Sequence, residues 1–184
     1  TGGANWEGSA FDPESGLLFV PSQTRVGLMQ LVNEPKLSDI KYISGTTPPP
    51  KVFGIPVAKP PWGRITAINL NTGQHQWVIA NGDTPKSIRD NPALKGVALP
   101  RTGKHTRSGI VVTKTLLFAG EGFGGDPVFR AHDKLTGEII AEINLPATQA
   151  SPPSTYRFNG KQYIIMTIAS GKTPAELIAL SIPD

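Results

Sequence analysis

One short turn motif recurs along this sequence and limits what the chain can fold into. Asn69–Gly73 and Asp133–Gly137 share it, and Asp12–Gly16 is a looser copy: Asp or Asn comes first, Ser or Thr follows three residues later, and Gly comes next. The first side chain can accept backbone N–H groups, and the glycine supplies the positive φ of a tight turn. Short apolar runs flank each copy, so each is predicted to join two strands. Copies spaced about sixty residues apart indicate a repeated β unit with loops inserted between repeats.

The strand pattern around these turns matches the blades of a β-propeller. Four short apolar segments follow one another with brief turns at residues 109–112, 115–119, 127–131 and 138–143, which is the outline of one blade of four antiparallel strands. Residues 154–158, 163–168 and 176–181 begin another blade and stop one strand short, as in a closed propeller whose other terminus supplies the last strand. We predict an all-β fold, a partial propeller of about three blades, where at least about four are needed to close a ring.

Composition agrees with this fold class and excludes several functions. Glycine (20) and proline (18) together exceed a fifth of the 184 residues and only 17% are charged, so many turns and few long helices are expected. The net charge of +4 is spread evenly, which argues against nucleic-acid binding. Without cysteine there is no disulfide and no thiolate metal site. No apolar run approaches the roughly 20 residues that span a bilayer, and no signal peptide is visible.

Two long connections interrupt the strands. Residues 24–33 are candidates to continue the first sheet, but residues 34–62 contain Pro48–Pro50 and Pro60–Pro61 and should form a loop or an extended cover. That segment is either a surface insertion or a loop that lines the mouth of a site. Residues 83–107 form the second connection, in which 92–95 fit one helical turn.

Few residues suggest chemistry by their spacing. His75, His105 and His132 are scattered without the spacing of metal ligands, and we expect His75 and His132 on the blade surface. The glycine-rich stretch Glu121–Asp126 lacks the pattern of a phosphate-binding loop and is predicted to be a loop at the end of a blade. No pair of carboxylates stands out as general acid and base.

Two tryptophans invite different interpretations. Trp77, four residues after the turn glycine, is predicted to fill the space between neighbouring blades, and Ala141 takes its place in the next copy. Asn5–Trp6 lies at the entrance to a strand. A flat ring could stack on Trp6 while Asn5 offers hydrogen bonds, but the residues alone favour inter-blade packing by Trp6 and a turn role for Asn5.

These motifs together resemble a known family. The repeat is similar to the "tryptophan docking" motif of quinoprotein alcohol and sugar dehydrogenases, which use pyrroloquinoline quinone (PQQ); it is carried here by Ala67, Asn69, Thr72, Gly73 and Trp77. Further stretches in the order of that family's C-terminal part are 2–6, 10–20, 61–67 and 159–164. The glucose, quinate and shikimate dehydrogenases are the branch that the sequence resembles most.

The resemblance implies an eight-bladed propeller with PQQ near its axis, held by Ca²⁺. It implies that residues 1–184 are the C-terminal portion of a single propeller domain in the periplasm. Asn5 and Trp6 take the places of cofactor-binding residues, and Arg107 and Ser108 stand, less faithfully, where the family has a Trp-Gly-Gly or Gly-Gly-Pro segment. The family's catalytic Asp and its Ca²⁺ ligands lie upstream, so no catalytic or metal-binding residue is assigned in this chain. The chain alone should lack turnover.

The partners that the resemblance implies are a small sugar or alcohol as substrate and ubiquinone or a cytochrome as electron acceptor. Open sheet edges should also favour self-association. A second hypothesis is a non-catalytic propeller scaffold that has lost the cofactor, which Ala141 and the departure at 107–108 favour. The long loops and Asn5–Trp6 favour the dehydrogenase, because a substrate funnel is built from loops over one face. A glycan-binding β domain has only its aromatic residues in support.

Overall fold

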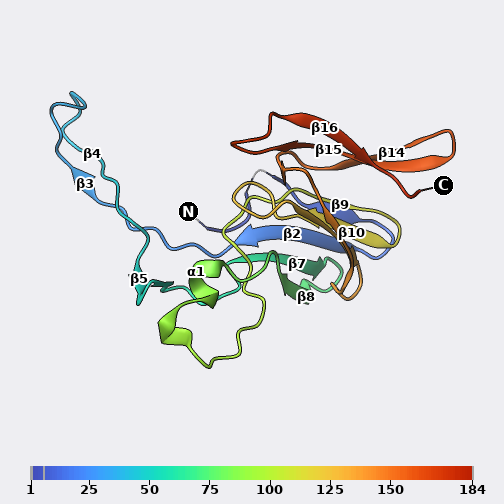
Figure 1. Cartoon of the computed structure of the whole chain (residues 1–184), viewed down its shortest axis with the longest axis horizontal. Coiled ribbons are helices and arrows are strands. Elements are labelled where there is room, and N and C mark those ends of the chain that lie inside the picture. Colours follow the sequence, from blue (N-terminus) through green and yellow to red (C-terminus); the bar gives the residue numbers. More distant parts are fainter. Residues whose placement is uncertain (1, 6, 184) are drawn as a thin grey trace.

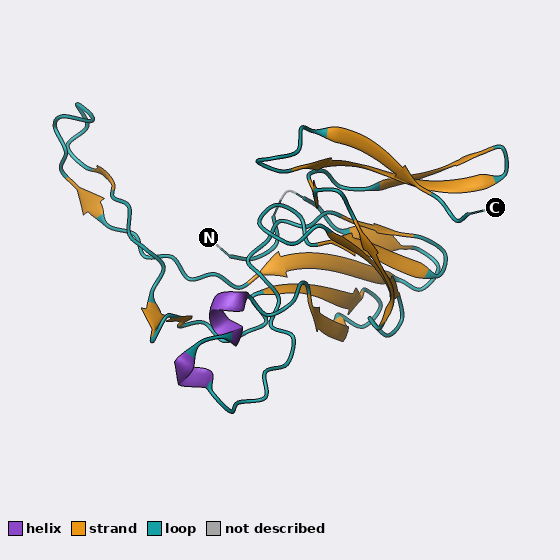
Figure 2. Ribbon diagram, in the orientation of Figure 1, coloured by secondary structure: helices purple, strands orange, loops and turns teal. Residues whose placement is uncertain are grey.

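A computed structural model describes residues 2–5 and 7–183 and shows antiparallel sheets that stack face to face (Figures 1 and 2). The first sheet has the order β1-β2-β7-β8 and consists of β1 (Ala10–Asp12), β2 (Leu17–Gln23), β7 (Gly63–Asn69) and β8 (Gln74–Ala80). The second has the order β12-β11-β10-β9 and consists of β9 (Ile110–Val112), β10 (Leu116–Gly120), β11 (Val128–Asp133) and β12 (Ile139–Asn144). Both are complete four-stranded blades, as predicted.

The third sheet is built around its longest strand. It consists of β13 (Thr148–Gln149), β14 (Ser154–Phe158), β15 (Lys161–Ala169) and β16 (Glu176–Leu180). β13 and β14 pair with different parts of one edge of β15, and β16 pairs with its other edge. The predicted turn at 159–160 joins β14 to β15, with positive φ at both Asn159 and Gly160. The prediction of a partial propeller with about three blades is confirmed.

The recurring motif forms the same turn in each copy. The N–H groups of Gly16, Gly73 and Gly137 donate to the carbonyls four residues earlier at 2.8–2.9 Å, and all three glycines have φ between 70° and 79°. Side chains add a second set of bonds, because the first residue accepts backbone N–H groups, for example Asn71 N to Asn69 Oδ1 at 2.9 Å and Leu135 N to Asp133 Oδ1 at 2.8 Å. The three copies of the motif therefore form the turns that join β1 to β2 and β7 to β8 in the first blade and β11 to β12 in the second.

Two hydrophobic clusters lie between consecutive sheets. The first joins blades one and two and includes Phe19, Ile65 and Leu117, all fully buried. The second joins blades two and three and includes Phe129 and Met166. Inward-facing residues that alternate along each strand thus bury their apolar surface against the next blade.

Trp77 and a buried ion pair add polar contacts to the first inter-blade interface. The Trp77 ring packs against Phe19 at a centroid distance of 5.7 Å, and its Nε1–H donates to the Lys134 carbonyl at 3.1 Å. The Lys134 Nζ donates to Asp12 Oδ2 at 2.5 Å, so the first and third copies of the motif are linked across the interface. Burial alone would raise the pKa of Asp12, but hydrogen bonds from Lys134 and Ser15 outweigh it and lower that pKa. The predicted docking of Trp77 between blades is confirmed.

His132 is buried, so its predicted place on the blade surface is wrong. His132 is 2% exposed, and its Nδ1–H donates to the Gly137 carbonyl at 3.0 Å. His132 pairs with Leu117 and so lies on the face of its sheet that the first blade covers. The sequence does not reveal this burial, because it depends on how the two blades pack together. Burial lowers the pKa of His132, and the bond to Gly137 only partly opposes this. The other histidine of the pair, His75, is exposed as expected.

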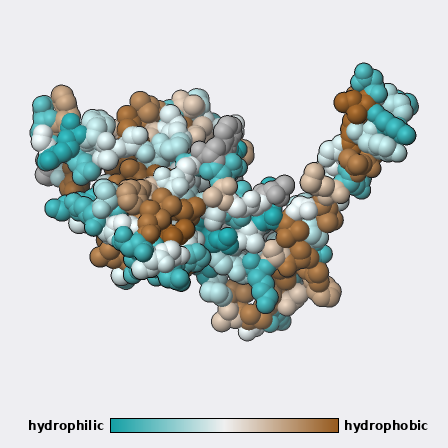
Figure 3. Space-filling view, turned by 180° about the vertical axis from the view of Figure 1, so that it is seen from behind, coloured by the Kyte–Doolittle hydropathy of each residue, from teal (hydrophilic) through white to brown (hydrophobic). Residues whose placement is uncertain are grey.

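The connection between β2 and β7 leaves the blades as a long arm. Residues 24–33 do not continue the sheet as expected; β3 (Leu31–Val32) pairs only with β4 (Ile43–Ser44) within the arm, and β5 (Lys51–Val52) pairs with β6 (Ile55–Pro56) at its base. The arm extends away from the body, and Met29, Leu31 and Leu37 are more than 70% exposed on it (Figures 1 and 3). The two short strands of the arm pair only with each other, so this segment does not form a blade. Residues 34–62 are thus largely a surface insertion.

The second long connection, between β8 and β9, stays close to the blades. It contains α1 (Lys86–Arg89), which the sequence did not predict, and a 3₁₀ turn at Pro92–Leu94, where one helical turn was expected. Among the described residues no helix is long and apolar enough to cross a membrane.

Candidate functional site

The long connections leave from one end of the blades and surround a small polar hollow there. β2 ends and β7 begins beside it, β8 ends there, and the chain that leads into β9 completes it. The residues that line this polar hollow include Asn5, Arg64, Asn81, Thr106, Arg107 and Ser108. Its volume is about 20 Å³, room for a group the size of one water molecule.

Three of the four residues predicted to bind the cofactor meet in this hollow. Asn5, Arg107 and Ser108 all line it although about a hundred residues separate Asn5 from the other two. The backbone of Gly3 pairs with that of Gln23 through bonds of 2.6 and 3.1 Å, which holds the segment around Asn5 against the end of β2. Trp6 lies outside the described residues.

Arg107 and Ser108 are held by partners of their own. The Arg107 guanidinium forms an ion pair with Glu7, and its backbone N–H donates to the Phe123 carbonyl at 3.3 Å. Ser108 is buried, and its hydroxyl donates to the Gly120 carbonyl at 2.5 Å. Ser108 therefore stabilises the junction of β9 and β10, while Arg107 places a charge that Glu7 balances at the rim.

Sequence reasoning missed two polar residues of the hollow. Arg64 is the second residue of β7; its Nε donates to Ser22 Oγ at 3.1 Å and its Nη1 to Thr24 Oγ1 at 2.7 Å. These bonds fix the guanidinium and leave further N–H donors on it. The only indication of this role in the sequence is that Arg64 is a lone charged residue at the start of an apolar strand. Asn81 directly follows β8, and its Asn-Gly sequence indicates only a turn.

Close backbone approach around the hollow depends on two glycines. A Cβ at Gly63 would lie 2.1 Å from the Lys104 carbonyl oxygen, and one at Gly122 would lie 1.7 Å from the Arg107 carbonyl oxygen. Both distances are far inside van der Waals contact, so any side chain would push the 83–107 connection away from the blades. The two glycines thus allow that connection to lie against β7 and against the loop after β10.

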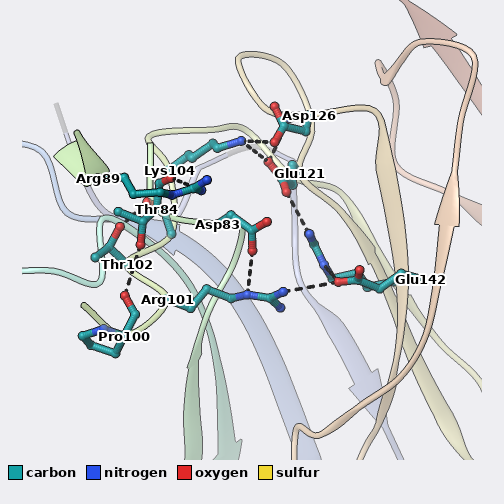
Figure 4. Close-up of polar contacts among 12 residues, drawn as sticks. Asp83, Thr84, Arg89, Pro100, Arg101, Thr102, Lys104, Glu121, Asp126 and Glu142 are labelled. Atoms are coloured by element: carbon teal, nitrogen blue, oxygen red, sulfur yellow. Dashed lines mark hydrogen bonds and ion pairs between the residues drawn. The ribbon is translucent and has the colours of Figure 1, made fainter. Parts of the chain in front are cut away.

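A buried ionic cluster pins the same connection to the second blade (Figure 4). Glu121 is fully buried and accepts from Arg130 at 2.9 Å, from Lys104 at 3.1 Å and from the Asp126 N–H at 2.8 Å. Arg130 also contacts Glu142 at 2.6 Å. Desolvation lowers the pKa of Arg130, but Glu142 and Glu121 outweigh it and raise that pKa, so the guanidinium stays charged. Lys104 lies two residues before Thr106, so the cluster fixes the segment that lines the hollow.

The polar hollow suits an anionic or oxygen-rich group. Arg64, Arg107 and Asn5 line a small space whose walls are held by backbone bonds and by the ionic cluster. Such pre-positioned donors bind carboxylates or carbonyl oxygens without rearrangement. Within residues 2–5 and 7–183, no three His, Cys, Asp or Glu side chains gather where they could hold a metal ion.

Comparisons with known proteins agree with this architecture. The family described as "Glucose/ethanol/alcohol dehydrogenase, beta-propeller domain", designated PQQ, matches residues 1–164. The quinoprotein glucose dehydrogenase of Gluconobacter oxydans is 32% identical over 145 residues, which cover 72% of this chain and 17% of that protein. The quinate/shikimate dehydrogenase (quinone) of Acinetobacter baylyi is 29% identical over 201 residues, 93% of this chain and 24% of that protein.

A solved structure shows the same fold. The quinohemoprotein alcohol dehydrogenase from Comamonas testosteroni superposes with a TM-score of 0.60 at 19% identity, over 91% of this chain and 22% of that one. The chain therefore spans about a quarter or less of the length of each of these three proteins.

Proposed function

Because the chain belongs to the PQQ β-propeller family of glucose, ethanol and alcohol dehydrogenases, we propose that it is part of a PQQ-dependent dehydrogenase. In this proposal the enzyme oxidises an alcohol group of a sugar or polyol and passes the electrons to a quinone or a cytochrome. The observation that carries it is the polar hollow, where Asn5, Arg64 and Arg107 converge at one end of the blades.

The residues of the hollow fit PQQ, which presents quinone oxygens and carboxylate groups. The fixed guanidinium of Arg64 is suited to a carboxylate, and the Asn5 amide can donate to a quinone oxygen. The hollow has room only for an edge of such a ring system, so these blades supply one wall of the site. When bound, PQQ accepts the hydride that leaves the alcohol carbon.

The chain's own residues orient the cofactor and shield it. In this proposal the Asn5 amide donates to a quinone oxygen and so favours the negative charge that develops there. Arg64 holds its ligand in one register through its bonds to Ser22 and Thr24. The Arg107–Glu7 pair balances charge at the rim, so Arg64 supplies the larger share of positive charge.

Other parts of the proposal rest on the family resemblance. On that basis we propose that the catalytic base and the Ca²⁺ ligands lie outside residues 1–184 and that the protein is periplasmic. Self-association through exposed sheet edges remains a prediction, which sedimentation at increasing protein concentration tests: a constant sedimentation coefficient would contradict it.

Turnover in the full-length protein tests the proposal. The protein is loaded with PQQ and Ca²⁺, and reduction of an artificial electron acceptor is followed with glucose, quinate, glycerol and ethanol. We expect PQQ-dependent reduction with at least one polyhydroxylated substrate. If PQQ does not bind at all, the propeller is a scaffold that has lost its cofactor.

A further inference from the structure

Asn81 carries an unused hydrogen-bond acceptor at the polar hollow. The residue is 4% exposed, and its other polar groups all have partners. Its backbone N–H donates to the Gly63 carbonyl at 2.9 Å, its carbonyl accepts from the Lys104 N–H at 3.1 Å, and its Nδ2 donates to the Gly120 carbonyl at 3.1 Å. Only Oδ1 has no partner among the described residues.

The chemistry of these partners fixes the orientation of the amide. A backbone carbonyl can only accept, so the atom that faces Gly120 must be the NH₂ group and the other must be the oxygen. Gln149 also has an unpartnered buried amide oxygen, but that oxygen lies 2.1 Å from where a Cβ of Gly120 would stand, so it fills the space that the glycine leaves. Asn81 instead lines the hollow together with Asn5 and Arg64.

A buried acceptor without a donor is rare in folded proteins and calls for an explanation. Beside Asn81, the hollow is lined by Arg64 and Arg107, whose guanidinium groups are donors, and by Glu7, whose carboxylate is an acceptor already paired with Arg107. Asn81 Oδ1 thus gives the hollow an acceptor beside its donors. A group that both accepts from a guanidinium and donates to an amide oxygen satisfies this set, and a hydroxyl group does both.

We propose that Asn81 is a ligand-binding residue whose Oδ1 accepts a hydrogen bond from an O–H or N–H group of the bound ligand. The inference rests on the proposed function and deepens it. The donor belongs either to a hydroxyl group of the substrate or to a ring N–H of the cofactor. In both cases Asn81 discriminates in favour of a ligand with a donor at this point, because a ligand without one leaves the buried oxygen unsatisfied.

The test compares Asn81→Leu with Thr84→Val in the full-length protein. Thr84 lies in the same connection, is buried, and donates to the Pro100 carbonyl at 3.1 Å, but it does not line the hollow. Both variants lose one buried bond from a side chain to a carbonyl, and only Asn81→Leu also loses an acceptor at the hollow. The Kd of PQQ is measured by quenching of tryptophan fluorescence, and kcat/KM is measured for glycerol and for ethanol.

Asn81→Leu should weaken either the affinity for PQQ or the preference for glycerol over ethanol by about threefold to tenfold, the usual contribution of one neutral hydrogen bond. A weaker Kd of PQQ assigns the donor to the cofactor; an unchanged Kd with a lower ratio of kcat/KM for glycerol over ethanol assigns it to the substrate. Asn81→Asp, which keeps an acceptor, should retain more of the affected quantity than Asn81→Leu. If Asn81→Leu changes the Kd and the ratio no more than Thr84→Val does, the assignment is wrong while the proposed function stands. Wild-type protein that binds no PQQ overturns both.

Discussion

Replacing Glu121 by glutamine should destabilise the protein more than any other single loss of charge in the ionic cluster. Glu121 has no exposed surface, and Arg130 beside it is 2% exposed. Removing one partner of a buried ion pair typically costs about 3–5 kcal/mol, because the other charge is left without compensation. Here Arg130 keeps Glu142 and Lys104 keeps Asp126, so we expect a loss of about 2–4 kcal/mol in the free energy of unfolding.

Urea unfolding followed by tryptophan fluorescence measures this loss. Asp126→Asn is the matched control, because its carboxylate contacts the same lysine but is more than half exposed, and exposed pairs contribute about 0–1 kcal/mol. In the double variant Glu121→Gln with Arg130→Met, the loss should be smaller than the sum of the single losses, since no buried charge is left alone. A cost for Glu121→Gln no larger than that of Asp126→Asn would refute the reasoning.

Three further predictions concern the interface between blades and the arm. Because the pKa of folded His132 is lowered, the unfolded chain takes up its proton first; the stabilisation is complete above about pH 6.5 and is lost as the pH falls from there toward the lowered value. Trp77→Ala should lower the free energy of unfolding by about 2–4 kcal/mol, through lost contact with Phe19 and a lost bond to Lys134. Replacing residues 27–45 by a short Gly-Ser linker should change that free energy by less than about 1 kcal/mol, because neither hydrophobic cluster includes these residues.

The same unfolding assay checks all three, with a control for each. His132→Asn should flatten the curve of stability against pH below about pH 6.5, and an unchanged slope would assign the effect to other groups. Trp77→Phe should cost less than Trp77→Ala, since it keeps a ring against Phe19. A large loss on removing residues 27–45 would mean that the arm packs against part of the protein outside this chain.

The blade architecture was predictable because its signal is local and repeated. Each turn needs an Asx side chain and a glycine at fixed positions, and the structure shows the same bonds in all three copies. Trp77 was assigned correctly for a related reason: its distance from the turn glycine places it on the strand that meets the next blade. Short apolar segments separated by brief turns then indicated the strands of blades two and three.

The errors arose where distant segments decide the environment. His132 has the same local setting as a surface residue, and only the neighbouring blade buries it. The segment at 24–33 has strand-like residues but no neighbouring blade strand to pair with. Residues 121–126 form the predicted loop at the end of a blade, but the sequence did not indicate that Glu121 is the centre of an ion cluster, because its partners Arg130 and Lys104 come from a strand and from another loop.

The hollow was predictable only in part. The resemblance identified Asn5 and the 107–108 segment, and the fold brings them together. Arg64 and Asn81 carry no motif, because their roles depend on which strand ends meet at one end of the blades. Geometry of that kind is absent from the spacing of residues along the chain.

The affinity of the full-length protein for PQQ, measured for wild type and for Arg64→Met, tests the central claim most directly. Met keeps much of the length of the side chain and removes the guanidinium that Ser22 and Thr24 hold at the hollow. If these blades form one wall of the cofactor site, the Kd should rise by about tenfold or more, as expected for the loss of a charge-assisted bond. Equal affinity in the two proteins, with both correctly folded, would show that the hollow does not contact the cofactor.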